Sequence, residues 1–245
     1  MSAPRAIVIA GPGTNRDGDI AGALQRAGAA PEVVLSGQLV ADPALLSGAQ
    51  LLVVAGGFSY GDALGAGRML ALELSLGHLG DSLREFVAAG KPVLGICNGF
   101  QVLTRAGLLP GALGHNAGGS FQCRWVTLQP ASTRSIWTRD MTSPIVCPIA
   151  HGEGRYVAAD LAALQANDQV ALRYIDGTNP NGSVDDIAGV SDASGVVLGL
   201  MPHPENAVLP RQMPHAAGNR SPAHSSEPSA ALQLLINGVS YAKDR

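Results

Sequence analysis

Residues 92–99 read Pro-Val-Leu-Gly-Ile-Cys-Asn-Gly, an apolar run that ends at a cysteine with glycines on both sides. The run 92–96 predicts a buried parallel strand. Residues 98–105 have helical spacing and predict a helix directly after it. A sharp turn from strand to helix lifts the side chain of Cys97 out of the sheet, and it needs small neighbours. This arrangement is typical of a nucleophile elbow.

The chain on both sides of this elbow alternates between apolar runs and segments of helical spacing. Further strands are expected at 6–10, 32–35 and 51–54, and helices at 17–27, 82–89 and 230–243. Short strand-like runs follow at 124–128, 145–150, 170–175, 187–191 and 196–201. We therefore expect an α/β fold, a single domain over 1–245 with a mostly parallel open sheet, helices on both faces and an antiparallel extension.

Composition narrows the class of protein. Of the 245 residues, 46% are hydrophobic and only 14% are charged, which excludes a charge-rich disordered chain. The net charge of −3 argues against nucleic acid as a partner. No apolar run is long enough for a membrane span, and three cysteines favour neither a disulfide framework nor a zinc site. We expect a soluble cytoplasmic protein that binds no metal and has no membrane partner. The polar segment 209–229 is expected to be a mobile loop.

Cys97 has two readings. At the first turn of a helix its thiolate is favoured, and the backbone N–H of Asn98 can point at a developing oxyanion. A lone cysteine is, however, most often a small buried hydrophobic residue. The pentapeptide by itself leaves both readings open.

Two further segments have the residues that a cysteine nucleophile needs. The loop 55–62 carries paired glycines that let backbone N–H groups approach a ligand, although it also reads as an ordinary glycine-rich turn. In Met-Pro-His-Pro-Glu at 201–205, His203 and Glu205 are two apart and face one side of an extended chain. In one interpretation Glu205 orients His203, which acts as the general base. In the other, the two residues form only a His-Glu pair on the surface.

At these residues the chain resembles the class I (triad) glutamine amidotransferases, which have a flavodoxin-like fold. The motifs GGFSYGD, CNGFQ, AHGEG and NPNGS resemble one branch, the glutaminase subunits of phosphoribosylformylglycinamidine (FGAM) synthase. Matching segments cover nearly the whole chain: PGTNRDGD at 12–19, GGFSYGDALGAG at 56–67, GICNGFQVLTRAGLLPGAL at 95–113, CRWVTL at 123–128, PIAHGEGRY at 148–156, NPNGS at 179–183 and LGLMPHPENAV at 198–208.

The resemblance implies hydrolysis of glutamine through a thioester on Cys97, with His203 moving protons and Glu205 orienting it. It implies the other site residues as follows: backbone N–H groups of Gly57 and Asn98 in the oxyanion hole, and Gln101 and His151 in the glutamine pocket. Gln101 reads equally as a residue of the helix face. His151 reads equally as a loop histidine that holds the Gly-Glu-Gly turn.

The resemblance also implies partners. No G-x-x-x-x-G-K-[ST] loop is present, so no ATP site is expected on this chain. ATP and Mg²⁺ belong instead to a separate synthetase subunit, which aminates formylglycinamide ribonucleotide, and many bacteria add a small third subunit. No cofactor is expected here. Two alternatives remain: another γ-glutamyl hydrolase with a cysteine triad, and a non-catalytic amidotransferase-like module.

Overall fold

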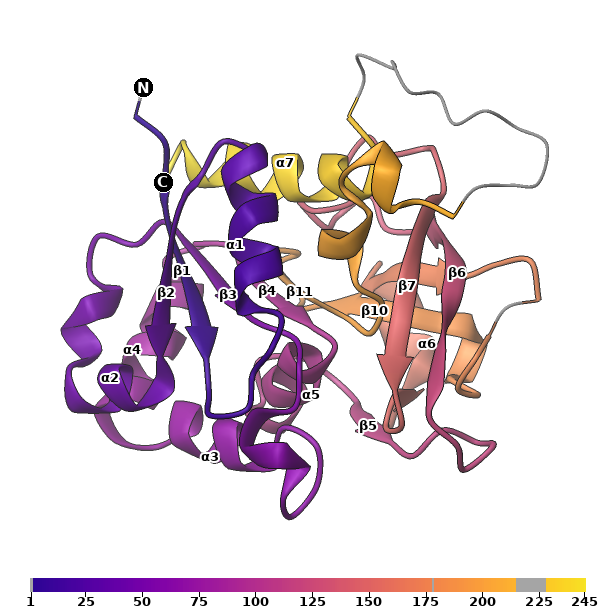
Figure 1. Ribbon diagram of the computed structural model, residues 1–245, viewed down its shortest axis with the longest axis horizontal. Coiled ribbons are helices and arrows are strands. Elements are labelled where there is room, and N and C mark those ends of the chain that lie inside the picture. Colours follow the sequence, from indigo (N-terminus) through magenta and orange to yellow (C-terminus); the bar gives the residue numbers. More distant parts are fainter. Residues whose placement is uncertain (1, 178, 215–227) are drawn as a thin grey trace.

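The computed structural model describes residues 2–177, 179–214 and 228–245. Within them lies one nine-stranded sheet, in the order β2-β1-β3-β4-β11-β10-β9-β6-β7, and a small sheet of β5 and β8 (Figure 1). The strands are β1 (Arg5–Ala10), β2 (Ala30–Leu35), β3 (Leu51–Val54), β4 (Val93–Ile96), β5 (Ala112–Gly114), β6 (Gln122–Pro130), β7 (Ile145–His151), β8 (Arg155–Val157), β9 (Val170–Tyr174), β10 (Ile187–Ser191) and β11 (Val197–Leu200). The helices are α1 (Asp17–Arg26), α2 (Ser36–Ala41), α3 (Arg68–Ser75), α4 (Gly77–Ala88), α5 (Asn98–Arg105), α6 (Leu161–Ala166) and α7 (Ala230–Ala242).

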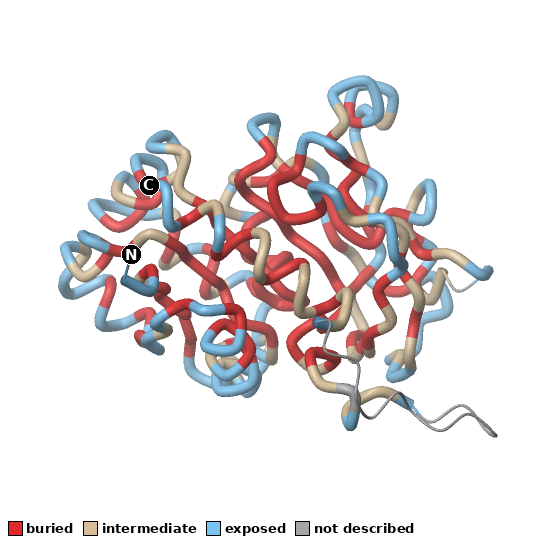
Figure 2. Tube along the Cα trace, turned by 90° about the horizontal axis from the view of Figure 1, so that it is seen from above, coloured by how far each residue is buried: buried red, intermediate tan, exposed pale blue. Residues whose placement is uncertain are grey.

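The parallel half of the sheet forms as predicted. β1, β2, β3 and β4 pair in parallel, and β1, β3 and β4 are apolar and buried along nearly their whole length. Strands buried on both faces need continuous apolar runs, which is why the sequence identifies them. The buried residues follow these strands through the middle of the molecule, while the loops at the periphery are exposed (Figure 2).

One expectation about the second half is wrong. We assigned residues 196–201 to the antiparallel extension, but β11 lies in the middle of the sheet and pairs in parallel with β4. Only its other neighbour, β10, runs antiparallel. β11 is fully buried, because it lies between β4 and β10 and α5 packs against it. The rest of the extension is antiparallel as expected: β10 with β9, β9 with β6, and β6 with β7.

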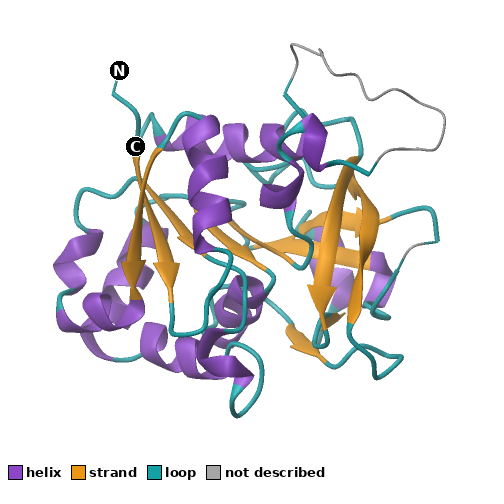
Figure 3. Cartoon of the chain, in the orientation of Figure 1, coloured by secondary structure: helices purple, strands orange, loops and turns teal. Residues whose placement is uncertain are grey.

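Helices cover both faces of the parallel strands (Figure 3). α1 and α7 contact each other on one face, whereas α3, α4 and α5 pack together on the other. α4 begins at Gly77, five residues before the predicted 82, although two glycines weaken its first turn. Leu79 is buried and holds that turn. The sequence analysis also missed α2, α3, α6, β5 and β8, which are short elements that depend on packing.

Residues 210–212 form a 3₁₀ turn (Pro210–Gln212) within the segment expected to be a mobile loop. Most of that segment, 215–227, lies outside the described residues. Within the part of the chain that the structure describes, no helix is both long and apolar enough to cross a membrane.

Parallel strands end at a common edge of the sheet. The arrowheads of β1, β2 and β7 point to the same lower side in Figure 1. The residues predicted for catalysis and for the oxyanion hole follow β3, β4 and β11, and β7 ends at His151, predicted for the glutamine pocket. The strand order itself therefore brings segments distant in sequence to one edge.

The contact of α5 with β3 predicts the effect of one substitution. A Cβ at Gly99 would collide with the carbonyl oxygen of Val54. We expect Gly99→Ala to lower the free energy of unfolding by about 2 kcal/mol or more, because backbone must move to relieve the overlap. Urea denaturation of the variant measures this.

Gly22→Ala is the matched control, since Gly22 lies on the exposed side of α1 with open space around it. Alanine there should raise the free energy of unfolding by up to about 1 kcal/mol. Similar changes in both variants would show that helix propensity, rather than the close approach of α5 to β3, decides the result.

Candidate active site

Cys97 occupies a strained turn between β4 and α5. Its φ is +50° and its ψ is −103°, in a region that residues other than glycine rarely adopt. Its backbone N–H donates to the carbonyl oxygen of Leu200 at 2.8 Å, which ties the elbow to β11. A Cβ at Gly95 would lie 2.7 Å from the carbonyl oxygen of Gly99, so a larger residue would block the turn. The elbow predicted from the sequence therefore forms.

The thiol of Cys97 is largely covered, with 5% of the residue exposed. Its Sγ lies 3.9 Å from the carbonyl oxygen of Ala150 on β7. All three cysteines are free, but their surroundings differ: Cys123 is exposed, and Cys147 is fully buried. Burial raises the pKa of the Cys147 thiol well above its usual value, and the carboxylate of Glu205 adds to the shift.

His203 and Glu205 form a buried pair. The Nδ1 atom of His203 lies 2.6 Å from Oε1 of Glu205, and both residues are almost fully covered. The backbone differs from the expected extended stretch, because Glu205 lies in a 3₁₀ turn, η4 (Pro204–Ala207). The backbone N–H of His203 donates to the carbonyl oxygen of Pro148 at 2.8 Å, which holds the ring beside β7.

The charge on His203 is set by competing effects. Burial favours the neutral ring, but the carboxylate of Glu205, the sulfur of Cys97 and hydrogen bonds to both outweigh it. Together they raise the pKa of His203 well above its usual value. Glu205 holds Nδ1 of His203, and the Cys97 side chain acts on the same ring, so the cysteine, the histidine and the glutamate form one interacting group.

The paired glycines after β3 pack directly against this group. A Cβ at Gly56 would lie 2.9 Å from Cε1 of His203, so only glycine leaves room for the imidazole. Gly57 has a φ of +134°, and a Cβ there would lie 2.6 Å from the backbone nitrogen of Asn15. Asn98 is the first residue of α5, so its N–H has no acceptor within the helix. Oxyanion binding by Gly57 and Asn98 stays a prediction.

The side chain of Asn98 joins the glycine-rich loop to the elbow. Its Oδ1 accepts from the hydroxyl of Ser59 at 2.6 Å and from the Ser59 backbone N–H at 3.3 Å. Its Nδ2 donates to Oε1 of Gln101 at 2.9 Å and to Oδ1 of Asp62 at 3.3 Å. The sequence analysis missed Ser59 and Asp62. Their place within the motif GGFSYGD was the signal available in the sequence.

Gln101 belongs to this network, whereas His151 is held by Asn116 at the end of β7. Nε2 of Gln101 donates to the carbonyl oxygen of Glu153 at 2.5 Å. Nδ1 of His151 lies 3.2 Å from Oδ1 of Asn116, which also accepts from the backbone N–H of Gly154. A Cβ at Gly154 would collide with the His151 ring. The His151 ring therefore packs against the Gly-Glu-Gly turn, and Asn116 bonds to both; glutamine binding by Gln101 and His151 stays a prediction.

The two buried histidines differ in charge. Burial lowers the pKa of His151 to about 4, and the nearby charge of His203 acts in the same direction. His151 is therefore neutral at pH 7. Its Nε2 is buried and has no partner within the described residues.

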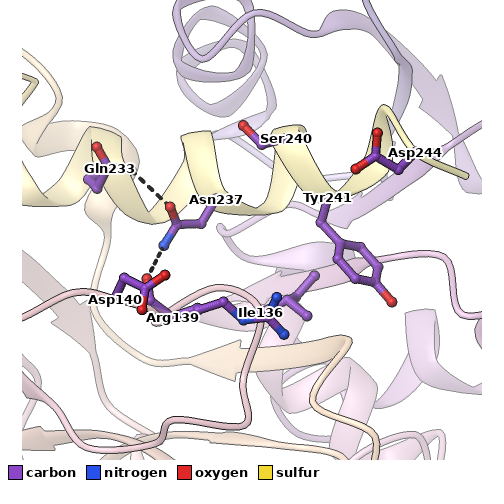
Figure 4. A pocket seen from close by; sticks show the side chains of 8 residues that line it. All are labelled: Ile136, Arg139, Asp140, Gln233, Asn237, Ser240, Tyr241 and Asp244. Atoms are coloured by element: carbon purple, nitrogen blue, oxygen red, sulfur yellow. Dashed lines mark hydrogen bonds between the residues drawn. The ribbon is translucent and has the colours of Figure 1, made fainter.

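Nothing else in the described residues competes with this site for chemistry. No three His, Cys, Asp or Glu side chains among them are grouped to hold a metal ion. A pocket of about 430 Å³ lies between α7 and the loop that joins β6 to β7, where Arg139, Asn237 and Tyr241 line it (Figure 4). That loop meets the beginning of β11 through Trp137 and Val196, so the pocket is at the sheet edge opposite Cys97.

Comparison with known proteins identifies the family. Residues 3–242 match the family described as the CobB/CobQ-like glutamine amidotransferase domain. The chain belongs to this family. A phosphoribosylformylglycinamidine synthase subunit PurQ from Treponema denticola is 46% identical over 273 residues, which cover 97% of this chain and 98% of the relative. Another PurQ, from Pyrobaculum aerophilum, is 45% identical over 216 residues, covering 87% and 93%. Within the family, the chain belongs with the PurQ subunits.

Solved structures agree on the fold. A chain in the structure of PurLQS from Thermotoga maritima is 34% identical, with a TM-score of 0.77 and 98% of each chain covered. A glutamine amidotransferase from the same organism is 18% identical, has a TM-score of 0.55 and shows the fold alone, over 86% of this chain and 80% of that one. The α/β fold expected from the sequence is confirmed.

The bond between Ser59 and Asn98 predicts a selective kinetic defect. We expect Ser59→Ala to lower kcat for glutamine hydrolysis about tenfold, because the loop that carries Gly57 loses its tie to the elbow. Alkylation of Cys97 by iodoacetamide should keep its rate, since that reaction develops no oxyanion. Steady-state kinetics and alkylation rates together measure this.

Ser132→Ala is the control, because Ser132 is also buried and hydrogen-bonded but belongs to the loop at the opposite edge. It should keep its kcat. If Ser59→Ala slowed alkylation as much as hydrolysis, Cys97 itself would have moved, and the positioning role of Ser59 would be wrong.

The neutral state of His151 predicts a pH dependence of stability. Between about pH 4 and pH 6.5 the unfolded chain binds a proton at His151 that the folded chain does not. This contribution to stability is therefore present above pH 6.5 and lost as the pH falls toward 4. From pH 7 to pH 5, wild type should lose about 2 kcal/mol more than His151→Gln in urea denaturation. His78→Gln, an exposed site on α4, should behave as wild type.

Proposed function

We propose that this chain is the glutaminase subunit of FGAM synthase in purine biosynthesis. It hydrolyses glutamine and supplies ammonia to an ATP-dependent synthetase subunit. The observation that carries the proposal is the buried group of Cys97, His203 and Glu205, within a sequence 46% identical to a PurQ subunit. The strained elbow supports a nucleophile, since strain at an ordinary buried cysteine would only cost stability.

The proposed reaction begins with thioester formation. His203 takes the proton of the Cys97 thiol, the thiolate sulfur attacks the side-chain amide carbon of glutamine, and negative charge develops on the amide oxygen. Backbone N–H groups of Gly57 and Asn98 stabilise that charge. His203 then donates a proton to the leaving nitrogen, so that ammonia departs and a γ-glutamyl thioester remains on the sulfur.

Hydrolysis uses the same groups in reverse. Once it has given up its proton, His203 accepts one from a water molecule, and that water attacks the thioester carbon. Glutamate leaves and the proton returns to Cys97 or stays on the imidazole. Glu205 keeps Nδ1 of His203 protonated throughout, which fixes the ring orientation and offsets its positive charge. Gln101 and His151 bind the rest of the glutamine.

The ammonia acceptor belongs to a partner. The relative in the PurLQS structure has PurL and PurS beside it, which supports a complex of this chain with a synthetase subunit and a small third subunit. ATP and Mg²⁺ act on the synthetase, and this chain works as one domain in the cytoplasm without a cofactor of its own.

The decisive experiment uses Cys97→Ser in the complex with the cognate synthetase subunit. Synthesis from glutamine should fall by at least about a thousandfold, because serine is a far weaker nucleophile here. Synthesis from added ammonium should remain near wild type, because the acceptor chemistry lies on the partner. Formation of FGAM measures both rates.

Cys123→Ser is the matched control, since Cys123 is exposed on β6 and should retain both activities. Labelling with a diazo-ketone glutamine analogue should modify Cys97 and neither of the other thiols. Full glutamine-dependent synthesis by Cys97→Ser would overturn the mechanism and leave a non-catalytic module as the better reading.

A further inference from the structure

Two aromatic side chains are exposed although they touch each other. Phe58 is 40% exposed and Phe121 is 53% exposed, whereas the other two phenylalanines, Phe86 and Phe100, are buried. The rings of Phe58 and Phe121 are stacked, with centroids 6.4 Å apart and planes 29° apart. Single exposed apolar residues are common, but a stacked aromatic pair presents a continuous apolar surface.

The pair lies beside the active site. Phe58 directly follows Gly57, in the loop whose next residue, Ser59, is bonded to Asn98. Phe121 precedes β6, and its ring would lie 3.8 Å from a Cβ placed on Gly152. Gly152 in turn follows His151 at the end of β7.

These two segments flank the nucleophile from opposite sides. The loop after β3 packs on the His203 ring through Gly56, and β7 brings the carbonyl oxygen of Ala150 to within 3.9 Å of the Cys97 sulfur. The stacked rings of Phe58 and Phe121 therefore connect these two segments at the exposed surface next to the site.

Ammonia, the product of the proposed reaction, requires a surface that excludes water. Ammonia reacts with the acceptor only while it is unprotonated, and contact with bulk water at neutral pH converts most of it to ammonium. A partner that takes ammonia directly must therefore exclude water around the exit. Rigid aromatic rings are well suited to this, since they bury a large area on binding and lose few rotamers.

We propose that Phe58 and Phe121 form the docking surface for the synthetase subunit and seal the ammonia exit against water. This inference rests on the proposed function. The synthetase is the occupant because the surface is continuous with the site whose product that subunit consumes. It should offer a matching apolar recess, so that the two rings are covered in the complex.

The experiment compares Phe58→Ala, Phe121→Ala and the double variant in two assays. Affinity for the cognate synthetase, measured by surface plasmon resonance, should fall at least tenfold in the double variant. In the assembled complex at saturating concentration, more glutamine should be hydrolysed for each FGAM formed, at least twofold above the wild-type ratio. Synthesis from added ammonium in the same saturated complex should stay within twofold of wild type.

Leu35→Ala is the matched control, because Leu35 is 54% exposed on the edge strand β2 and should change neither assay. Phe121→Ala keeps the inference testable if Phe58→Ala disturbs the neighbouring Gly57. Wild-type affinity and wild-type hydrolysis ratio in the double variant would overturn the inference. So would loss of a self-association of this chain, seen by sedimentation, with synthetase affinity unchanged.

The affinity assay needs no glutaminase activity. If wild type bound the synthetase but hydrolysed no glutamine, the proposed function would fail while the docking surface could still be confirmed.

Discussion

The strained backbone of Cys97 is the constraint on which the rest of the site depends. A φ of +50° at a residue with a Cβ persists only where the surroundings hold it. Here β4 lies between β3 and β11, and the N–H of Cys97 is bonded to the carbonyl oxygen of Leu200. Glycines at 95 and 99 let α5 start without a clash. Contacts of β4 and Cys97 with the neighbouring strands in the middle of the sheet therefore compensate for the backbone strain at Cys97.

Electrostatics gives each buried histidine its own role. His203 has the carboxylate of Glu205 on one side and the Cys97 sulfur on the other, which keeps it able to carry a positive charge under complete burial. His151 is also buried, and among the described residues no carboxylate offsets that burial; the charge of His203 lowers its pKa further, so it stays neutral at pH 7. The pKa values of the two imidazoles are thus shifted in opposite directions, and such a separation is typical of groups with different protonation states at pH 7.

The parts of the fold that the sequence predicted are those with a strong local pattern. β1, β3 and β4 are continuous apolar runs, and α5 begins directly after the elbow at the predicted residue. β11 has an equally clear run, but its place in the centre of the sheet was not predicted. The apolar residues of a strand indicate that it is buried. Which strands pair with it depends on how the whole chain packs.

The sequence by itself determined the candidate catalytic groups: a cysteine at a strand-to-helix turn, and a histidine two residues before a glutamate. Each of these motifs consists of residues close together in the sequence, so the motif alone is sufficient to recognise them. Only the tertiary structure decided that Asn98 holds Ser59, 39 residues away, and that Phe58 stacks on Phe121. Such pairs meet because parallel strands end at one edge of the sheet, and no local pattern encodes which loops will be neighbours there.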